Sequence, residues 1–325
     1  MWLILLLWLQ TPEHGIEHRT VTNILRTIPV SGDNGHLVSL YACSLTDDHL
    51  LLLDRDSLKV ASVGLSDGKV TFFSGLGQAP GELNSLVHSF FVEKDLLRVF
   101  HANGKRLDLF HPSGQHISSD RLDEPGEVLF LDERGTVTRV GQDPKTFRLS
   151  TRKGVAEVEA FPMKVFGFYL RTALFQDRYF LVANKSANKD LFIFVVFDMT
   201  EGTIQGPFEV VPIDKKYENG TPSWVLKSLR KKGVEIPDGR PNIFMTMLNP
   251  VVVHDNFGFM MCEESESTDP TFTVHLYDPR SKARRLMRIK KGPLQIPRFF
   301  LPLEDKRWVT FDSEDDEIVI FNMKK

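Results

Sequence analysis

Cysteine is nearly absent from this 325-residue chain, which has only two, Cys43 and Cys262. Two cysteines cannot build a disulfide framework, and one distant pair does not match a metal-site spacing. Charge of one sign is also lacking, because the formal net charge is only −3. Such a chain has no long-range attraction toward nucleic acid or an anionic membrane surface. We therefore expect a monomeric globular protein that binds no nucleic acid.

Apolar runs long enough to span a bilayer, which takes about 20 residues, are missing as well. A shorter run, MWLILLLWLQ, opens the chain. It matches the apolar centre of a secretory signal, although no Lys or Arg precedes it and TPEHG offers no small-x-small cleavage site. We interpret residues 1–15 as a signal-like segment and predict export to the periplasm, envelope or medium. A cytoplasmic chain with an apolar start is the alternative.

Phenylalanine, by contrast, is abundant, with 25 residues against five Tyr and four Trp. Aromatic and β-branched residues favour half-buried strands. Strand-like runs recur along the chain and end at tight polar turns. These turns lie at residues 47–49, 93–95, 132–135, 176–178, 254–256 and 304–306. Units of roughly 40–50 residues with four short strands each are the signature of a β-propeller.

The last unit has only three strand-like runs, RFFLPLE, RWVTFD and EIVIFN, before the chain ends. A fourth run is available at the other end, in HRTVTNILRTIPV (residues 18–30). Pairing it with the last unit would remove both open sheet edges. The sequence therefore predicts an all-β protein, a six-bladed β-propeller of four-stranded blades over residues 16–325, with its ring closed by the N-terminal strand.

One stretch, residues 211–245, interrupts the repeat between the fourth and fifth blades. Within it, TPSWVLKSLRKKG predicts a helix that begins after Thr221 and ends at Gly233. This small helical insert is interpreted either as a lid over the channel mouth or as a decoration packed on its own blades. The lid residues would be Trp224, Arg230 and Lys231.

Loops between the second and third strands of each blade should share one face of the ring with the crossings between blades. We predict ligand contacts from these loops, through Asp54, His101, Asn184, Glu263 and Asp312. Two neighbouring loops, EESESTD and DSEDDE, are strongly acidic. Clustered carboxylates suit Ca²⁺, but solvated loop tips explain the same pattern, and the spacing is not that of an EF-hand. No other cofactor is predicted.

The junction after the first blade reads SGLGQAPGELNS and includes Gly75, Gly77, Pro80, Gly81 and Glu82. It resembles the GxGQGPGE-like junctions of the bacterial six-bladed β-propeller family, relatives of the NHL-repeat propellers. The resemblance implies a fold more strongly than an activity, and many members of that family carry export signals. Physically, the glycines permit tight turning, and Glu82 can accept hydrogen bonds from backbone N–H groups at the turn.

Catalytic motifs are scarce: the chain has no HExxH zinc motif and no GxSxG elbow. The leading interpretation is a non-enzymatic binding or scaffold propeller of the cell envelope. It would recognise a peptide, glycan or protein partner on one face of the ring. The alternative is a metal-dependent propeller hydrolase or lyase of the lactonase type.

Overall fold

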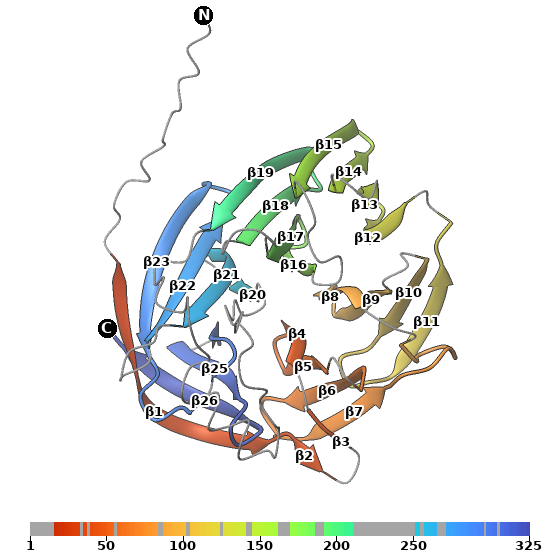
Figure 1. Cartoon of the computed structure of the whole chain (residues 1–325). Helices are drawn as coiled ribbons and strands as arrows, with labels where there is room; N and C mark the ends of the chain where they lie inside the picture. The colour runs from red at the N-terminus through yellow and green to blue at the C-terminus, as the bar shows by residue number, and fades with distance from the viewer. Residues whose placement is uncertain are drawn as a thin grey trace, which may run out of the picture.

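The fold was obtained as a computed structural model that describes most of the chain from residue 16 onward. Not described are residues 1–15, 33–34, 38–39, 55–56, 84–86, 102–104, 124–125, 141–144, 162–169, 186–191, 211–250, 254–256, 265–270, 296 and 304–305. Every element in the described residues is a β-strand, and the sheets stand around a ring (Figure 1). The predicted β-propeller of four-stranded blades is therefore confirmed as a fold class. No helix in this part of the chain could cross a membrane.

Four of the sheets are separate four-stranded antiparallel blades. The first consists of β4 (Leu40–Leu45), β5 (His49–Asp54), β6 (Lys59–Gly64) and β7 (Val70–Ser74). The second consists of β8 (Val87–Glu93), β9 (Leu96–His101), β10 (Arg106–Phe110) and β11 (His116–Arg121). The third consists of β12 (Glu127–Asp132), β13 (Gly135–Val140), β14 (Lys145–Thr151) and β15 (Gly154–Phe161). The fourth consists of β16 (Arg171–Phe175), β17 (Tyr179–Lys185), β18 (Phe192–Asp198) and β19 (Thr203–Val210).

The fifth sheet has eight strands in the order β20-β21-β22-β23-β1-β26-β25-β24. Its first half consists of β20 (Val251–Val253), β21 (Phe257–Glu264), β22 (Thr271–Asp278) and β23 (Ala283–Lys290). Its second half consists of β1 (Glu17–Pro29), β26 (Glu317–Lys324), β25 (Arg307–Asp312) and β24 (Leu301–Pro302). A small hairpin of β2 (Ser31–Gly32) and β3 (Gly35–His36) follows β1.

Strand β1 closes the ring as the sequence predicts. It pairs antiparallel with β26, from Thr20 opposite Lys324 to Pro29 opposite Glu317. Its first residues also pair in parallel with β23, from Glu17 opposite Met287 to Thr20 opposite Lys290. The prediction of six blades is therefore wrong as a count of sheets. The ring contains five, because β1 forms hydrogen bonds on both sides and so joins the seven strands β20 to β26 into one eight-stranded sheet.

The core lies between the faces of neighbouring sheets and is rich in phenylalanine. Phe91 of β8, Phe130 of β12 and Phe180 of β17 are all buried and join three consecutive blades. The ring centroid of Phe91 lies 5.7 Å from that of Phe130 and 5.5 Å from that of Phe180. Aromatic pairs at 4.5–7 Å stabilise a core beyond the area they bury. These three phenylalanines, part of the excess of Phe in the sequence, thus form contacts between blades.

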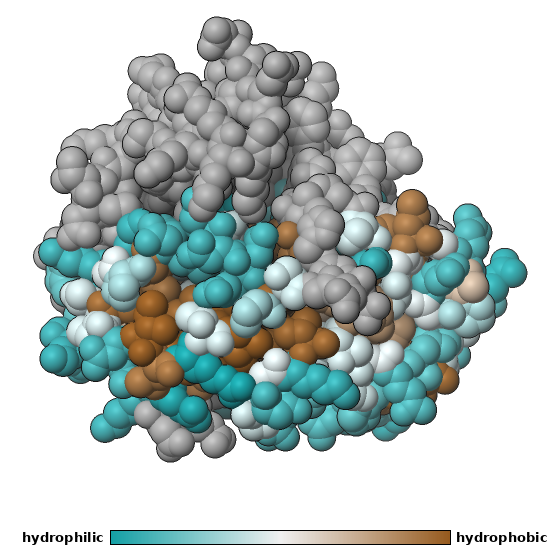
Figure 2. Space-filling model, turned by 90° about the horizontal axis from the view of Figure 1, so that it is seen from below, coloured by the Kyte–Doolittle hydropathy of each residue, from teal (hydrophilic) through white to brown (hydrophobic). Residues whose placement is uncertain are grey.

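The outer side of β1 carries apolar residues that are only partly covered. Figure 2 shows the molecule of Figure 1 from below, which is the side along which part of β1 runs. Hydrophobic residues gather on this side among hydrophilic ones. Ile24 and Leu25 of β1 are 42% and 49% exposed, whereas Val21 and Ile28 of the same strand are buried. Strand β1 therefore has both buried and exposed apolar side chains.

The predicted helical insert cannot be compared with the structure. The stretch 211–245, including Trp224, Arg230 and Lys231, lies outside the described residues, as does the signal-like segment 1–15. Among the described residues there is no helix.

Candidate ligand cavity at the centre of the ring

The alternation of strand direction sorts the connections of each blade to two ends of the ring. The turns between first and second strands, such as that between β4 and β5, lie at one end, which we call the turn end. The loops between second and third strands lie at the opposite end, which we call the loop end. The ligand contacts predicted from the sequence belong to the loop end, because Asp54, His101 and Asp312 close their second strands.

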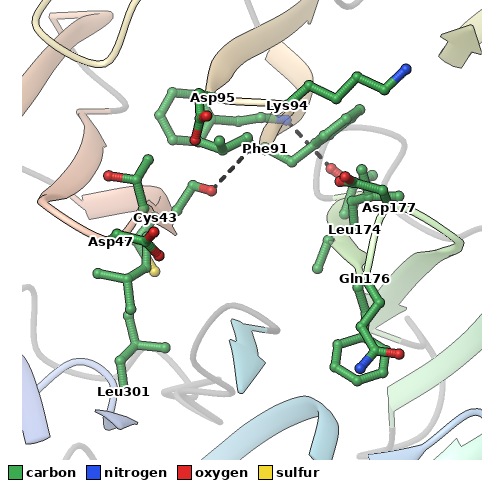
Figure 3. Close-up of a pocket in the computed structure, with 17 residues that line it drawn as sticks. Cys43, Asp47, Phe91, Lys94, Asp95, Leu174, Gln176, Asp177 and Leu301 are labelled. Carbon is green, nitrogen blue, oxygen red and sulfur yellow. Dashed lines mark hydrogen bonds between the residues drawn. The ribbon is translucent and has the colours of Figure 1, made fainter. Parts of the chain in front are cut away.

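A cavity of about 470 Å³ opens at the turn end. Its walls are inner strands and the turns that follow them, from β4, β8 and β16, with Leu301 of β24 (Figure 3). Small-molecule and side-chain binding pockets typically have volumes of about 300–1,000 Å³. The cavity is thus large enough for one or two side chains of a partner.

Two hydrogen bonds connect the inner strands around the cavity. The Val92 N–H donates to Ser44 Oγ at 3.1 Å, which ties β8 to β4. The Phe90 N–H donates to Thr172 Oγ1 at 3.4 Å, which ties β8 to β16 (Figure 3). These hydrogen bonds join the inner strands of three blades around the cavity.

The rim of the cavity is formed by tight turns, at places where the sequence predicts them. Lys94 and Asp95 have φ of 48° and 60°, and Gln176 and Asp177 have φ of 51° and 48°. This left-handed backbone conformation allows the chain to reverse direction in a two-residue turn between two strands. The side chains of Lys94, Asp95, Gln176 and Asp177 are exposed in these turns. Asp47, which follows β4, is exposed as well. Three carboxylates, of Asp47, Asp95 and Asp177, therefore stand at the rim.

Most residues that line the walls below the rim are of apolar type. Phe91, Leu174 and Phe175 are buried lining residues from β8 and β16. Cys43 also lines the cavity, and burial raises the pKa of its thiol to about 12, although the charge of Arg171 acts in the opposite direction. A thiol with so high a pKa stays protonated and unreactive at neutral pH. Cys43 acts here as a small apolar wall residue.

Beside the rim, a buried carboxylate connects the second and third blades. Glu93 ends β8 and is 1% exposed. Its Oε2 lies 2.6 Å from Arg98 Nε, and its Oε1 pairs with Arg134, which also pairs with Asp132. Burial raises the pKa of Glu93 from 4.5 to about 7, although Arg98 and Arg134 oppose the shift. Glu93 therefore gains a proton near neutral pH.

We expect Glu93 to make the fold more stable in mild acid. The unfolded carboxyl ionises near 4.5, so the folded state binds the proton more tightly between pH 4.5 and about 7. This contribution is complete below pH 4.5 and disappears as pH rises through 7. In denaturant titrations, the wild type should gain about 2–3 kcal/mol from pH 8 to pH 5 relative to Glu93→Gln. Parallel pH profiles of the two proteins would show that Glu93 does not titrate in this range.

The ligand contacts predicted at the loop end are mostly buried in the structure. Asp54, His101, Asn184 and Asp312 are at most 3% exposed. The Asp54 carboxylate accepts the Ser57 N–H at 2.7 Å, and the Asp312 carboxylate accepts the Gln295 N–H at 2.6 Å. Within the described residues the Asn184 Nδ2 has no hydrogen-bond partner. The side chain of Glu263 is outside the described part, and a ligand role for this set stays a prediction.

His101 belongs to a buried network inside the second blade. Its Nε2–H donates to Asp108 Oδ2 at 2.6 Å, and both side chains are fully buried. Asp108 also accepts hydrogen bonds from Arg106 Nε at 3.1 Å and from the Ser119 hydroxyl. Burial alone would raise the pKa of Asp108, but the hydrogen bonds from His101, Ser119 and Arg106 lower it overall. This set orders the loop end of the blade.

The glycine-rich junction docks on the same network. Glu82 accepts the Ala79 N–H at 2.9 Å with its carboxylate, and a Cβ at Gly77 would collide with that carboxylate. Gly75 and Gly81 have φ of 142° and 83°, and Pro80 lies between these two turns. Arg106 donates to the carbonyl oxygens of Ala79 at 2.9 Å and Glu82 at 3.0 Å. The junction thus contacts the second blade through Arg106.

Metal ligands do not converge in the described residues. No group of three or more His, Cys, Asp or Glu side chains there could hold an ion. Part of the acidic loop EESESTD lies outside the described residues, so calcium at the loop end stays a prediction.

The sequence contains one feature that indicates the cavity but does not enter the predicted ligand contacts. Asp47, Asp95 and Asp177 recur at the first turn of three blades, and these turns served only to mark the repeat. An acidic residue at the same turn in several units indicates a shared charged rim.

No family model and no curated protein matches this chain. The family resemblance of the junction therefore rests on the junction's own residues. Solved propellers do resemble the chain. The WD40 domain of Toxoplasma gondii coronin is 8% identical with a TM-score of 0.47, covering 96% of this chain and 87% of that chain.

Two further solved structures show the same range of similarity. The PQQ-bound aldose sugar dehydrogenase of Streptomyces coelicolor is 12% identical with a TM-score of 0.45, covering 93% of this chain and 98% of that chain. BamB of Moraxella catarrhalis is 13% identical with a TM-score of 0.37, covering 88% and 86%. These similarities concern the fold alone, and a propeller fold does not specify a function.

Proposed function

We propose that this chain is a binding propeller that takes part of a protein, peptide or glycan partner into the cavity at the turn end. One observation carries the proposal: a cavity of about 470 Å³ at the ring centre, lined below its rim mostly by apolar residue types, with three exposed carboxylates and Lys94 at the rim. Concave sites with mostly apolar walls and a few placed polar groups are the usual form of a binding site.

The walls supply affinity and the rim supplies orientation. Apolar surface that a ligand removes from water contributes roughly 25 cal/mol per Å². The hydrogen bonds from Val92 to Ser44 and from Phe90 to Thr172 fix the walls. Preorganised walls lower the entropy that binding would otherwise cost.

We place this activity in the cell envelope, and the apolar run of residues 1–10 is what supports export. The metal-dependent hydrolase or lyase stays an untested alternative, which no observation in the described residues favours.

Filling the cavity should abolish partner capture. Leu45 and Val92 line the cavity and are half-buried, so Leu45→Trp or Val92→Trp places an indole in it. The matched control is Ile117→Trp, on the outer strand β11, where the side chain is 49% exposed. Affinity-tagged variants are incubated with periplasmic and envelope fractions of the source cells, and captured material is quantified by mass spectrometry.

We expect both cavity variants to recover at least about tenfold less partner than the wild type, and Ile117→Trp to recover the same amount. Melting curves establish that the compared variants are folded. Equal recovery by folded cavity variants and the wild type would place the binding surface elsewhere.

A further inference from the structure

We infer that the cavity selects a cationic side chain with an apolar stem or neighbour, as in a peptide segment that alternates Lys or Arg with apolar residues. This inference rests on the proposed function, because it names the ligand class of the same cavity. It joins two observations, the apolar residues that line the cavity and the three rim aspartates that form no ion pair in the described part of the chain.

The rim aspartates form no ion pair within the described part of the chain, although Asp177 lies close enough to Arg134 to raise the pKa of that guanidinium. Asp47, Asp95 and Asp177 are exposed and form no ion pair there. The cations nearby are bound by other carboxylates. Lys94 Nζ lies 2.7 Å from Glu133 Oε1, and Arg134 pairs with Glu93 and Asp132.

Figure 3 shows how these groups lie around the opening. Asp47 and Asp95 stand on one side and Asp177 on the other, while the side chain of Lys94 extends outward, away from Asp47. Rim carboxylates that face a common opening act together on a ligand within the Debye length, about 8 Å at physiological ionic strength. A cation entering the cavity is attracted by all three, and an anion is repelled.

The interior selects for an aliphatic stem. Leu45 and Val92 line the cavity beneath the charged rim and are only half-buried, so they offer apolar surface to a ligand. Lys and Arg place their methylene stems along apolar surface while the charged head stays at the polar edge. A cavity with apolar lining residues and carboxylates at its rim matches this side-chain type.

A sugar fits the same cavity less well. Tyr and Trp present an apolar ring with a hydrogen-bonding tip, which suits polar ligands with apolar faces. Neither residue type is among the described residues that line the cavity. The lining thus favours the peptide or protein partner over the glycan.

The test uses acetylated, amidated octapeptides that alternate Arg with Leu, labelled with a fluorophore for anisotropy titrations. Matched peptides replace Arg by Ser or Glu, and a fourth replaces Leu by Ser. The rim variant combines Asp47→Asn, Asp95→Asn and Asp177→Asn. Its charge-matched control combines Asp120→Asn, Asp123→Asn and Glu201→Gln, which are exposed carboxylates away from the cavity.

We expect the Arg–Leu peptide to bind the wild type at least about tenfold more tightly than the Ser–Leu, Glu–Leu or Arg–Ser peptide. The rim variant should lose that preference, and the charge-matched control should keep it. Binding of the Arg–Leu peptide should weaken as salt rises from 50 to 300 mM, because exposed charges are screened.

Equal binding of the Ser–Leu, Glu–Leu or Arg–Ser peptide overturns the inference, as does an unchanged affinity in the rim variant or no binding of any peptide. The proposed function is judged separately by Leu45→Trp and Val92→Trp. If those variants lose the native partner while the rim variant retains it, the cavity binds a ligand that is not selected by charge. If Leu45→Trp and Val92→Trp retain the native partner, both the proposed function and this inference fail.

Discussion

Deletion of residues 18–30 should leave a chain that aggregates and lacks a cooperative melting transition. The deletion removes most of β1, the only strand that pairs with both β26 and β23 in the described sheet. Two sheet edges would then be exposed, and unpaired edges are templates for aggregation. Size-exclusion chromatography and differential scanning calorimetry measure the outcome. A truncated monomer that melts at the wild-type temperature would show that the ring does not depend on β1.

Two substitutions within β1 test how much its buried side chains contribute to stability when the strand itself is kept. Ile28 is 3% exposed, and Ile24 is 42% exposed. Ile28→Asp should cost more than about 3 kcal/mol of unfolding free energy, because it buries an unpaired carboxylate. Ile24→Asp should change it by less than about 1 kcal/mol. Similar losses at both positions would mean that β1 is not packed in the register that pairs Ile28 with Ile318.

The role of β1 could be predicted because it follows from local patterns. Each unit alternates short apolar runs with turns, and the last unit lacks a fourth run that residues 18–30 supply. The merged eight-stranded sheet could not be predicted in the same way. It depends on four parallel pairs between Glu17–Thr20 and Met287–Lys290, and residues so far apart in sequence leave no local signal of their pairing.

The candidate site was harder to predict than the fold, because burial is decided by packing between blades. Asp54, His101 and Asp312 have the polar composition of ligand loops, yet the structure buries them and hydrogen-bonds them within the protein. The cavity arises from the convergence of β4, β8 and β16, which no single blade encodes. Sequence periodicity locates the turns of a propeller, but the central opening depends on how the inner strands meet.

Replacing Asp108 by Asn should destabilise the fold by about 2–4 kcal/mol while leaving the cavity unaffected. Asp108 is fully buried and accepts hydrogen bonds from His101, Arg106 and Ser119. An amide in its place removes the charge that pairs with Arg106 and presents a donor to groups that already donate. Urea titration measures the loss, and Asp120→Asn on the exposed β11 is the control, expected to stay within about 0.5 kcal/mol of the wild type.

The pH dependence gives this prediction a second readout. The pKa of Asp108 is lowered in the folded state, so its stabilising contribution is present above the usual pKa of 3.8 and is lost as pH falls through the lower folded value. The difference in unfolding free energy between the wild type and Asp108→Asn should therefore narrow below pH 4.

Partner capture by the same variant distinguishes a structural role of His101 from the predicted ligand contact, because the cavity lies at the opposite end of the blade. If Asp108→Asn melts like the wild type but no longer captures the partner, the His101 network binds the ligand, and the loop end is the functional face.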